Sequence, residues 1–134
     1  MEKSVTEAIN YRRSVRKFDP NKEIDSKIVK KCIENAVLAP TSSNLQLWEF
    51  FHITNKELLI KLSKTCFNQP AASTAKQIIV VVTRKDLWKK RANQNINFFD
   101  SKKDKLTKKQ YDLTRKYYNK AVPLVYKDFL GIFS

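Results

Sequence analysis

Glycine is nearly absent from this sequence, and its scarcity excludes one common way of binding nucleotides. The 134 residues contain a single glycine, Gly131. P-loops and the dinucleotide-binding GxGxxG turn need several glycines, because only glycine lets the backbone approach a phosphate closely. Any nucleotide bound by this chain must therefore be held by side chains.

Cysteine and histidine are also scarce, which argues against metal and disulfide chemistry. The chain has two cysteines, Cys32 and Cys66, with no CxxC pair, and one histidine, His52. No metal site is predicted, and the cysteine usage favours a reducing, cytoplasmic location. His52 lies in a predicted strand, where a structural role is favoured over that of a catalytic base.

Long apolar runs are missing as well. No stretch of 18 apolar residues occurs, and the N-terminal segment begins with a polar, capped helix instead of a signal segment, so neither membrane insertion nor secretion is expected. The hydrophobic content of 42% is enough for one core. The chain is expected to form a single domain over residues 1–134.

Negative charge is in short supply, and the formal net charge is +14. Residues 84–120 carry 13 Lys or Arg against 4 Asp. Such an excess is typical of nucleic-acid-binding proteins, but here it lies in a polar segment without a recognition motif. A solvated surface is therefore favoured, a general attraction for anionic substrates stays open, and a nucleic-acid partner is disfavoured.

Capping residues and helical spacing predict the first two helices. Ser4 and Glu7 form a capping box, in which each side chain satisfies an open backbone N–H at a helix start. A second helix begins at Asp25 or Ser26 and ends before Pro40. This proline begins a polar loop.

Two strands and the helix between them are predicted next. The aromatic stretch 48–53 indicates a strand, and Thr54 with Glu57 suggests a capping box for the helix after it. Residues 78–83 form an uninterrupted β-branched run, typical of a central strand covered on both faces. Residues 68–75 lead into that strand.

Beyond residue 86 the apolar residues no longer recur at clear helix or strand spacing. Residues 91–106 are expected to be a polar linker or insertion. Thr107 with Gln110 then begins a helix that runs to about Lys120 and is ended by Pro123. The order of elements predicts an α+β fold with helices packed on a small mixed sheet.

Two blocks carry the chemistry of a candidate site. Residues 11–18 read Tyr-Arg-Arg-Ser-Val-Arg-Lys-Phe, and residues 39–48 contain Pro-Thr-Ser-Ser-Asn followed by Gln46 and Trp48. Guanidinium groups pair with two phosphate oxygens at once, and short polar side chains suit a ligand's hydroxyls. Taken singly, the first block also fits a solvated helix C-terminus and the second an ordinary loop.

Together, in this order and at this spacing, the blocks resemble the flavin site of the nitroreductase family, a group of FMN enzymes. The resemblance implies that the first block contacts the FMN phosphate and ring edge, and that the loop contacts the flavin from the other subunit of a homodimer. An asparagine before the second strand reaches the flavin in this family, and Asn68 matches it. The implied cofactor-binding residues are Arg12, Arg13, Ser14, Arg16, Pro40, Thr41, Ser42, Ser43, Asn44, Gln46 and Asn68.

The resemblance also implies an activity. Members of the family pass electrons from NADH or NADPH through flavin N5 to a small flat acceptor, such as a nitroaromatic or a quinone, in a ping-pong sequence. The cofactor carries that chemistry, so no catalytic protein residue is assigned.

The likeness covers about residues 4–86. The later flavin loop, a late basic phosphate contact and the terminal segment of the family are not recognisable, and Leu47 stands where relatives commonly carry proline. The chain is therefore interpreted as a shortened or divergent member. The alternative interpretation is a truncated, non-enzymatic relative that acts as a basic anion- or nucleic-acid-binding module.

Overall fold

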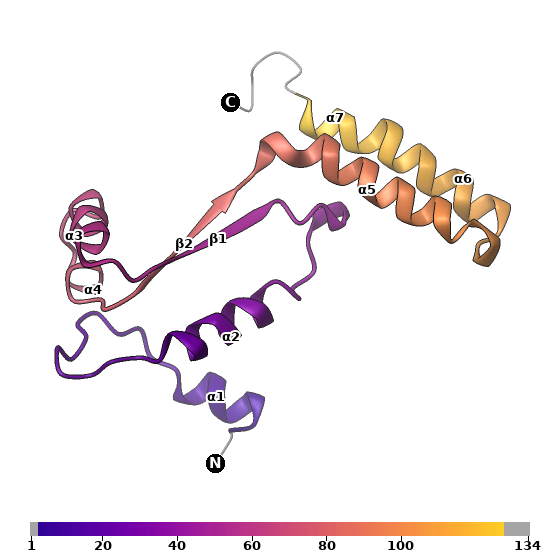
Figure 1. The fold of residues 1–134 in the computed structure, drawn as a ribbon. Helices are drawn as coiled ribbons and strands as arrows, with labels where there is room; N and C mark the ends of the chain where they lie inside the picture. Colours follow the sequence, from indigo (N-terminus) through magenta and orange to yellow (C-terminus); the bar gives the residue numbers. More distant parts are fainter. Residues whose placement is uncertain (1–2, 128–134) are drawn as a thin grey trace. The chain divides into compact units, whose positions relative to one another are not determined.

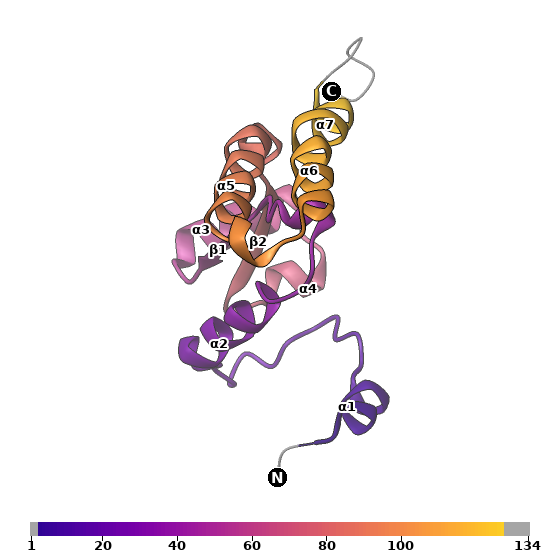
Figure 2. The ribbon, with the colours of Figure 1, turned by 90° about the vertical axis from the view of Figure 1, so that its right-hand side faces the viewer.

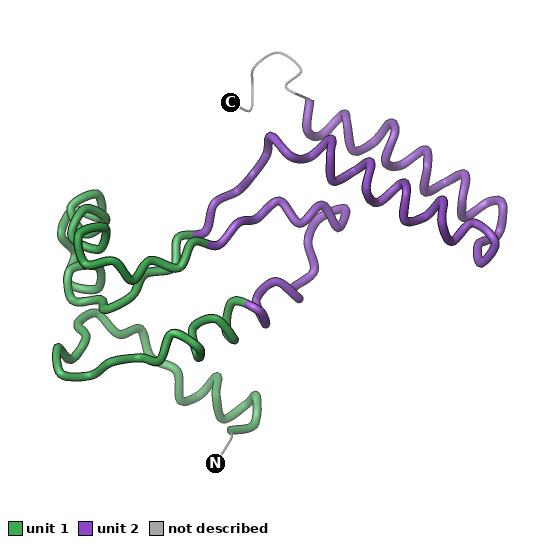
Figure 3. Tube along the Cα trace, viewed as in Figure 1, with its two compact units in different colours: residues 1–33, 51–80 green, residues 34–50, 81–134 purple. Residues whose placement is uncertain are grey.

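The computed structural model of the chain describes residues 3–127. They form two compact units, shown in different colours in Figure 3. Unit 1 comprises residues 3–33 and 51–80, and unit 2 comprises residues 34–50 and 81–127.

The structure contains two paired strands, and their bounds are those predicted from the sequence. They are β1 (Trp48–Ile53) and β2 (Ile78–Thr83), and they run antiparallel, with Arg84 N–H donating to the Leu47 carbonyl at 3.0 Å just beyond them. The α+β class is confirmed, with two antiparallel strands in place of a mixed set. The burial expected on both faces of β2 is wrong, because Ile79 and Val81 are exposed and burial alternates along the strand.

Capping residues set the starts of the first two helices. The Ser4–Glu7 box precedes α1 (Val5–Tyr11), as predicted, and both of its hydrogen bonds are present. Asp25 accepts from the Lys27 N–H at the start of α2 (Ser26–Ala36), which ends before Pro40 as expected. Local sequence is sufficient for both helices.

Unit 1 continues with α3 (Lys56–Thr65) and the short α4 (Pro70–Ser73), which lie side by side (Figure 1). The helix cap expected at Thr54 is wrong, because Asn55 is the N-cap and its side chain accepts from the Leu58 N–H. Asn and Asp are at least as good as Thr at this position. Pro70 is at the first helical position of α4, where its missing N–H costs nothing.

Helices dominate unit 2. The long α5 (Trp88–Ser101) lies beside α6 (Lys108–Lys116) and α7 (Val122–Tyr126) in both views of the ribbon (Figures 1 and 2). A polar linker or insertion was expected at 91–106, but residues 91–101 form most of α5, and a short 3-10 turn, Lys103–Lys105, follows it. The four-residue spacing of Trp88, Ala92 and Ile96 gives the helix an apolar stripe among polar residues.

Pro123 does not end the last helix. The Thr107–Gln110 capping box begins α6 as predicted, and a π-helical turn, Tyr117–Ala121, joins it to α7. Pro123 lies at the second position of α7, directly after this π-helical turn, in which the Val122 N–H bonds the Tyr117 carbonyl five residues earlier. The helical path therefore continues beyond the proline.

The buried hydrophobic residues of the described chain all belong to unit 2. They are Leu45, Ala92, Ile96, Tyr118 and Val122. Leu45 is 1% exposed, although it lies in the polar loop that was predicted to contact a ligand. That loop is therefore anchored in the core of its unit.

Candidate functional site

The arginine block follows α1 directly. Arg12 is the C-cap of this helix, and its guanidinium lies 3.5 Å from Ser14 Oγ. Arg12, Ser14 and Arg16 are all exposed, and none of the ion pairs found among residues 3–127 involves Arg12 or Arg16. Their guanidinium groups are therefore open to an external anion.

Arg13 has a different local role. Its Nη1 donates to the Asn10 carbonyl at 2.6 Å and to the Arg12 carbonyl at 2.9 Å. Both acceptors lie at the end of α1, where unpaired carbonyls favour a cation. Arg13 thus caps the helix, as the solvated-C-terminus interpretation of this block expected.

A shallow pocket of about 880 Å³ adjoins this helix end. Arg12 and Arg13 line it together with Lys3, Glu7, Asn10, Tyr11 and Val15. The Lys3 ammonium lies 4.3 Å from the centre of the Tyr11 ring. Downstream, Phe18 N–H donates to Thr74 Oγ1 at 2.9 Å and ties the segment to the end of α4.

The loop of the second block has an unusual backbone. Ser43, Asn44 and Gln46 have φ angles of 53°, 48° and 49°, in the left-handed region that non-glycine residues rarely occupy. Within the loop, Gln46 N–H donates to Thr41 Oγ1 at 3.1 Å, and Gln46 Nε2 donates to Asn44 Oδ1 at 3.2 Å. The short polar side chains thus first support the loop itself.

Three residues outside both blocks also contact this loop. Asn95 Nδ2 donates to the carbonyls of Ser43 and Asn44, at 3.2 and 3.0 Å, and Tyr118 OH donates to the Ser43 carbonyl at 2.9 Å. Tyr117 OH lies 2.6 Å from Ser43 Oγ. Sequence reasoning missed these residues. The one available signal was that Asn95 adjoins the apolar stripe of α5.

Burial affects the ionisation of Tyr118, which is 8% exposed. Desolvation is the main cause that raises the pKa of Tyr118, and the neighbouring Tyr117 adds to it. The phenol therefore stays protonated at physiological pH and remains a hydrogen-bond donor.

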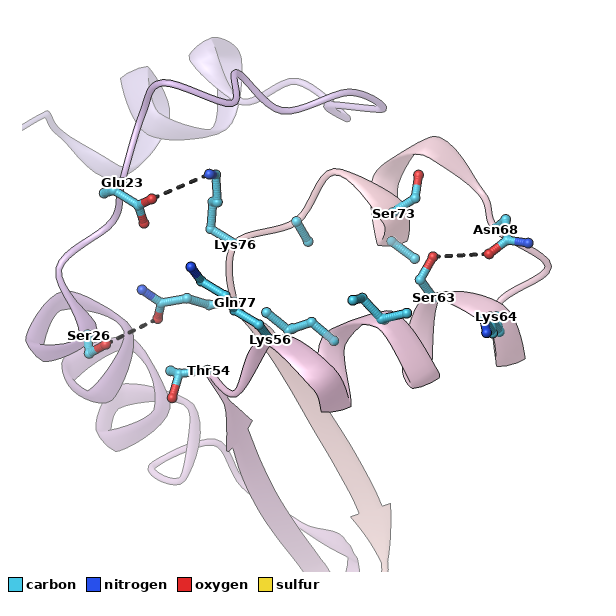
Figure 4. A pocket seen from close by; sticks show the side chains of 14 residues that line it. Glu23, Ser26, Thr54, Lys56, Ser63, Lys64, Asn68, Ser73, Lys76 and Gln77 are labelled. Atoms are coloured by element: carbon cyan, nitrogen blue, oxygen red, sulfur yellow. Dashed lines mark hydrogen bonds and ion pairs between the residues drawn. The ribbon is translucent and has the colours of Figure 1, made fainter.

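Asn68 lies in unit 1, after α3. It has a φ of 52°, and its Oδ1 accepts weakly from the buried Ser63 hydroxyl at 3.4 Å (Figure 4). It lines a pocket of about 610 Å³ with a partly apolar wall that includes Leu59 and Ala72. In this pocket Lys76 pairs with Glu23 at 3.4 Å.

The predicted site residues are divided between the units. Unit 1 holds the arginine block and Asn68, whereas unit 2 holds the whole loop from Pro40 to Gln46. Within unit 1, the arginines and Asn68 line separate pockets. Each block is therefore formed within its own unit.

Other charged and polar clusters are structural. Arg84 binds Glu49 and Asp86, and its hydrogen bond to Asp86 lowers the pKa of that carboxyl. Gln77 Nε2 donates to the Ile24 carbonyl at 2.6 Å, so its Oε1 accepts from His52 Nε2, also at 2.6 Å. His52 is thus a strand residue with a structural partner, as expected.

Residues 3–127 contain no cluster of His, Cys, Asp or Glu suited to a metal ion. Both cysteines are exposed and free. In the same part of the chain, no helix is long and apolar enough to cross a membrane.

Comparison with known sequences identifies relatives. The profile of the nitroreductase family matches residues 9–123. Protein DrgA of Synechocystis is 36% identical over 84 residues, which cover 63% of this chain and 40% of that protein. The oxygen-insensitive NADPH nitroreductase of Helicobacter pylori is 33% identical over 78 residues, 58% of this chain and 37% of that protein. The chain thus aligns with well under half of either relative.

Comparison with solved structures gives the same fold. A nitroreductase-like protein from Streptococcus mutans superimposes with a TM-score of 0.67 at 24% identity, covering 92% of this chain and 62% of the other. A protein from Exiguobacterium sibiricum, solved in complex with FMN, gives a TM-score of 0.60 at 28% identity, with coverage of 92% and 55%.

Proposed function

Because the chain belongs to the nitroreductase family, we propose that it binds FMN and transfers electrons from NADH or NADPH to a small flat acceptor. The Helicobacter relative is an NADPH nitroreductase by name, and the Exiguobacterium structure holds FMN. Nitroaromatics and quinones are the proposed acceptors.

One observation carries the proposal: two exposed arginines without an acidic partner among the described residues flank a serine hydroxyl. Arg12, Ser14 and Arg16 offer forked cationic donors and a neutral donor over five residues. This set fits a phosphate monoester, whose oxygens accept several charge-assisted hydrogen bonds. It replaces the glycine-rich backbone cradle that the chain cannot form.

The remaining proposed contacts have separate tasks. Ser42 and Asn44 are exposed and are proposed to bind the ribityl hydroxyls or the ring edge, with Thr41 and Gln46 supporting the loop's shape. Bound FMN supplies hydride acceptance and donation at N5, which makes a ping-pong exchange of donor and acceptor possible. The arginines favour negative charge near the bound cofactor.

We also propose a homodimer in which the loop of one subunit approaches the arginine block of the other. The family resemblance supports this arrangement, because it implies that the loop contacts the flavin from the other subunit. Two copies related by a two-fold axis form two equivalent sites, as a symmetric interface requires.

The test is FMN binding by an Arg12→Ala/Arg16→Ala double variant. Each lost hydrogen bond to a charged group is worth about 1.5 to 3 kcal/mol, so the dissociation constant should rise by roughly 100-fold or more. Quenching of flavin fluorescence on titration with protein measures it.

A Lys27→Ala/Lys31→Ala double variant is the matched control. It removes the same two positive charges from exposed positions on α2, which belong to the same unit. FMN affinity should stay near that of the wild type. Equal weakening in both variants would contradict a specific phosphate site and leave only general electrostatic attraction.

A further inference from the structure

We propose that Asn95 and Tyr118 are positioning residues that fix the Ser43–Asn44 turn in the conformation needed to meet the cofactor. Both belong to the C-terminal helices of unit 2, outside the two blocks that resemble a flavin site. The proposal rests on the FMN-binding function above, because the turn is part of the proposed flavin loop.

The turn needs external support because its backbone is strained. Left-handed conformation is unfavourable for a residue that carries a Cβ, less so for asparagine than for serine or glutamine. Ser43, Asn44 and Gln46 all adopt it within four positions, and none of them is glycine. Such a conformation persists only where surrounding contacts favour it, and clusters of this kind are frequent at ligand sites.

Asn95 supplies support with an unambiguous orientation. Its side chain faces two carbonyls, those of Ser43 and Asn44, and carbonyls only accept hydrogen bonds. The amide nitrogen must therefore point at the turn, with one hydrogen for each acceptor. A single side chain thus fixes two successive peptide groups of the strained segment.

Tyr118 completes the attachment. Its hydroxyl donates to the same Ser43 carbonyl, so that oxygen accepts from both Asn95 and Tyr118. Its ring is buried, and the ring centres of Tyr118 and Phe99 lie 6.1 Å apart. Because both donors come from helices that pack against each other, the turn is held by a rigid part of unit 2.

Because of this attachment, some side chains of the loop bind within the protein and others remain exposed. Tyr117 engages the Ser43 hydroxyl, and the Ser43 carbonyl is occupied by two donors. Leu45 is buried in the core. Ser43 and Leu45 thus anchor the turn, which leaves the exposed Ser42 and Asn44 side chains to face a ligand.

The experiment compares Asn95→Asp and Tyr118→Phe in the full chain. Asn95→Asp keeps the shape but replaces the amide NH2, which donates both hydrogen bonds, with an acceptor oxygen, and Tyr118→Phe removes only a hydroxyl. Asn97→Asp is the control, since Asn97 is exposed on the same helix and carries the same charge change. Hydrogen exchange of the Asn44, Leu45 and Gln46 amides measures the order of the turn without any cofactor.

Exchange at these amides should rise about tenfold or more in both variants, which corresponds to roughly one hydrogen bond, and should not change in the control. FMN affinity should fall by a similar factor in both variants. Unchanged amide exchange in both variants would show that Asn95 and Tyr118 do not hold the turn. Faster exchange with unchanged FMN affinity would show that they hold the turn but do not position it for the cofactor.

A wrong proposed function would give results different from those of a wrong positioning role. If the wild-type protein binds no FMN, the proposed function is wrong and the cofactor-positioning role is wrong with it. The amide exchange rates still report whether Asn95 and Tyr118 hold the turn. If FMN binds normally and Asn95→Asp behaves as the wild type in both measurements, only the inference about Asn95 is wrong.

Discussion

Single residues decide what the glycine-poor loop can do. Ser43 and Asn44 adopt the left-handed conformation that glycine usually provides, and Asn95 and Tyr118 bind the carbonyls that this conformation turns outward. In the proposed function, Arg12 and Arg16 replace a glycine nest in the same way, with side chains in place of backbone N–H groups. The near absence of glycine is thus offset by long side chains at specific positions.

Tyr118 should make the free energy of unfolding depend on pH in the alkaline range. The folded state raises the pKa of this phenol above its ordinary value of about 10, so the folded chain retains a proton that the unfolded chain releases. The stabilisation is complete below the ordinary pKa and is lost as pH rises through the folded one. The advantage of the wild type over Tyr118→Phe should therefore shrink above about pH 10.

Denaturant unfolding of both proteins at a series of alkaline pH values measures this difference. Leu38→Ala provides the control, because Leu38 is 79% exposed and its substitution removes no titrating group. Its difference from the wild type should stay constant with pH. A constant difference for Tyr118→Phe as well would show that the phenol gains no proton affinity on folding.

At the scale of elements, capping sequences predicted helix starts well. The boxes at Ser4 and Thr107 were both found, and both strands had the expected bounds. These signals are local, since a cap and its partner are three residues apart and strand propensity is read over six residues. The Thr54 cap was wrong because the adjacent Asn55 competes for the same backbone donors.

Features that depend on distant partners could not be predicted from the sequence. The weak apolar stripe of α5 is buried only because α6 and α7 pack against it, and Pro123 is accommodated by a π-helical turn. The motif residues of the proposed site could be identified from the sequence. The contacts of Asn95 and Tyr118 could not, because 51 and 75 residues separate them from the Ser43 region that they bind.

The two capping boxes should differ in their effect on stability. Thr107→Ala should lower the free energy of unfolding by about 1 kcal/mol, because α6 packs within unit 2 and loses its cap. Ser4→Ala removes an equivalent cap from α1, a helix whose residues are all exposed, so it should fray that helix and leave the main transition unchanged. Urea unfolding followed by circular dichroism compares them, and equal shifts would contradict this difference.

At the scale of the whole molecule, exposed apolar side chains support self-association. Large examples are Val5, Ile9, Ile28, Leu124 and Val125. Apolar surface of this kind commonly marks protein interfaces. The net charge of +14 opposes the approach of two copies, so the proposed dimer requires an interface that buries enough apolar area to outweigh that repulsion.

Dimerisation should be linked to FMN. If each cofactor contacts the arginine block of one subunit and the loop of the other, FMN strengthens the dimer by the same factor by which dimerisation strengthens FMN binding. Sedimentation velocity over a range of protein concentrations, with and without FMN, measures this coupling. Arg12→Ala/Arg16→Ala should lose the response to FMN, and an FMN-saturated monomer would contradict the shared site.

The visible spectrum of the protein after gel filtration decides whether side chains of this chain bind FMN. We expect a yellow protein, or a colourless one that gains a flavin absorbance band on incubation with FMN and keeps it through a second column. A protein that elutes without flavin after reconstitution would show that the proposed FMN binding is wrong and would favour a non-enzymatic, basic binding module.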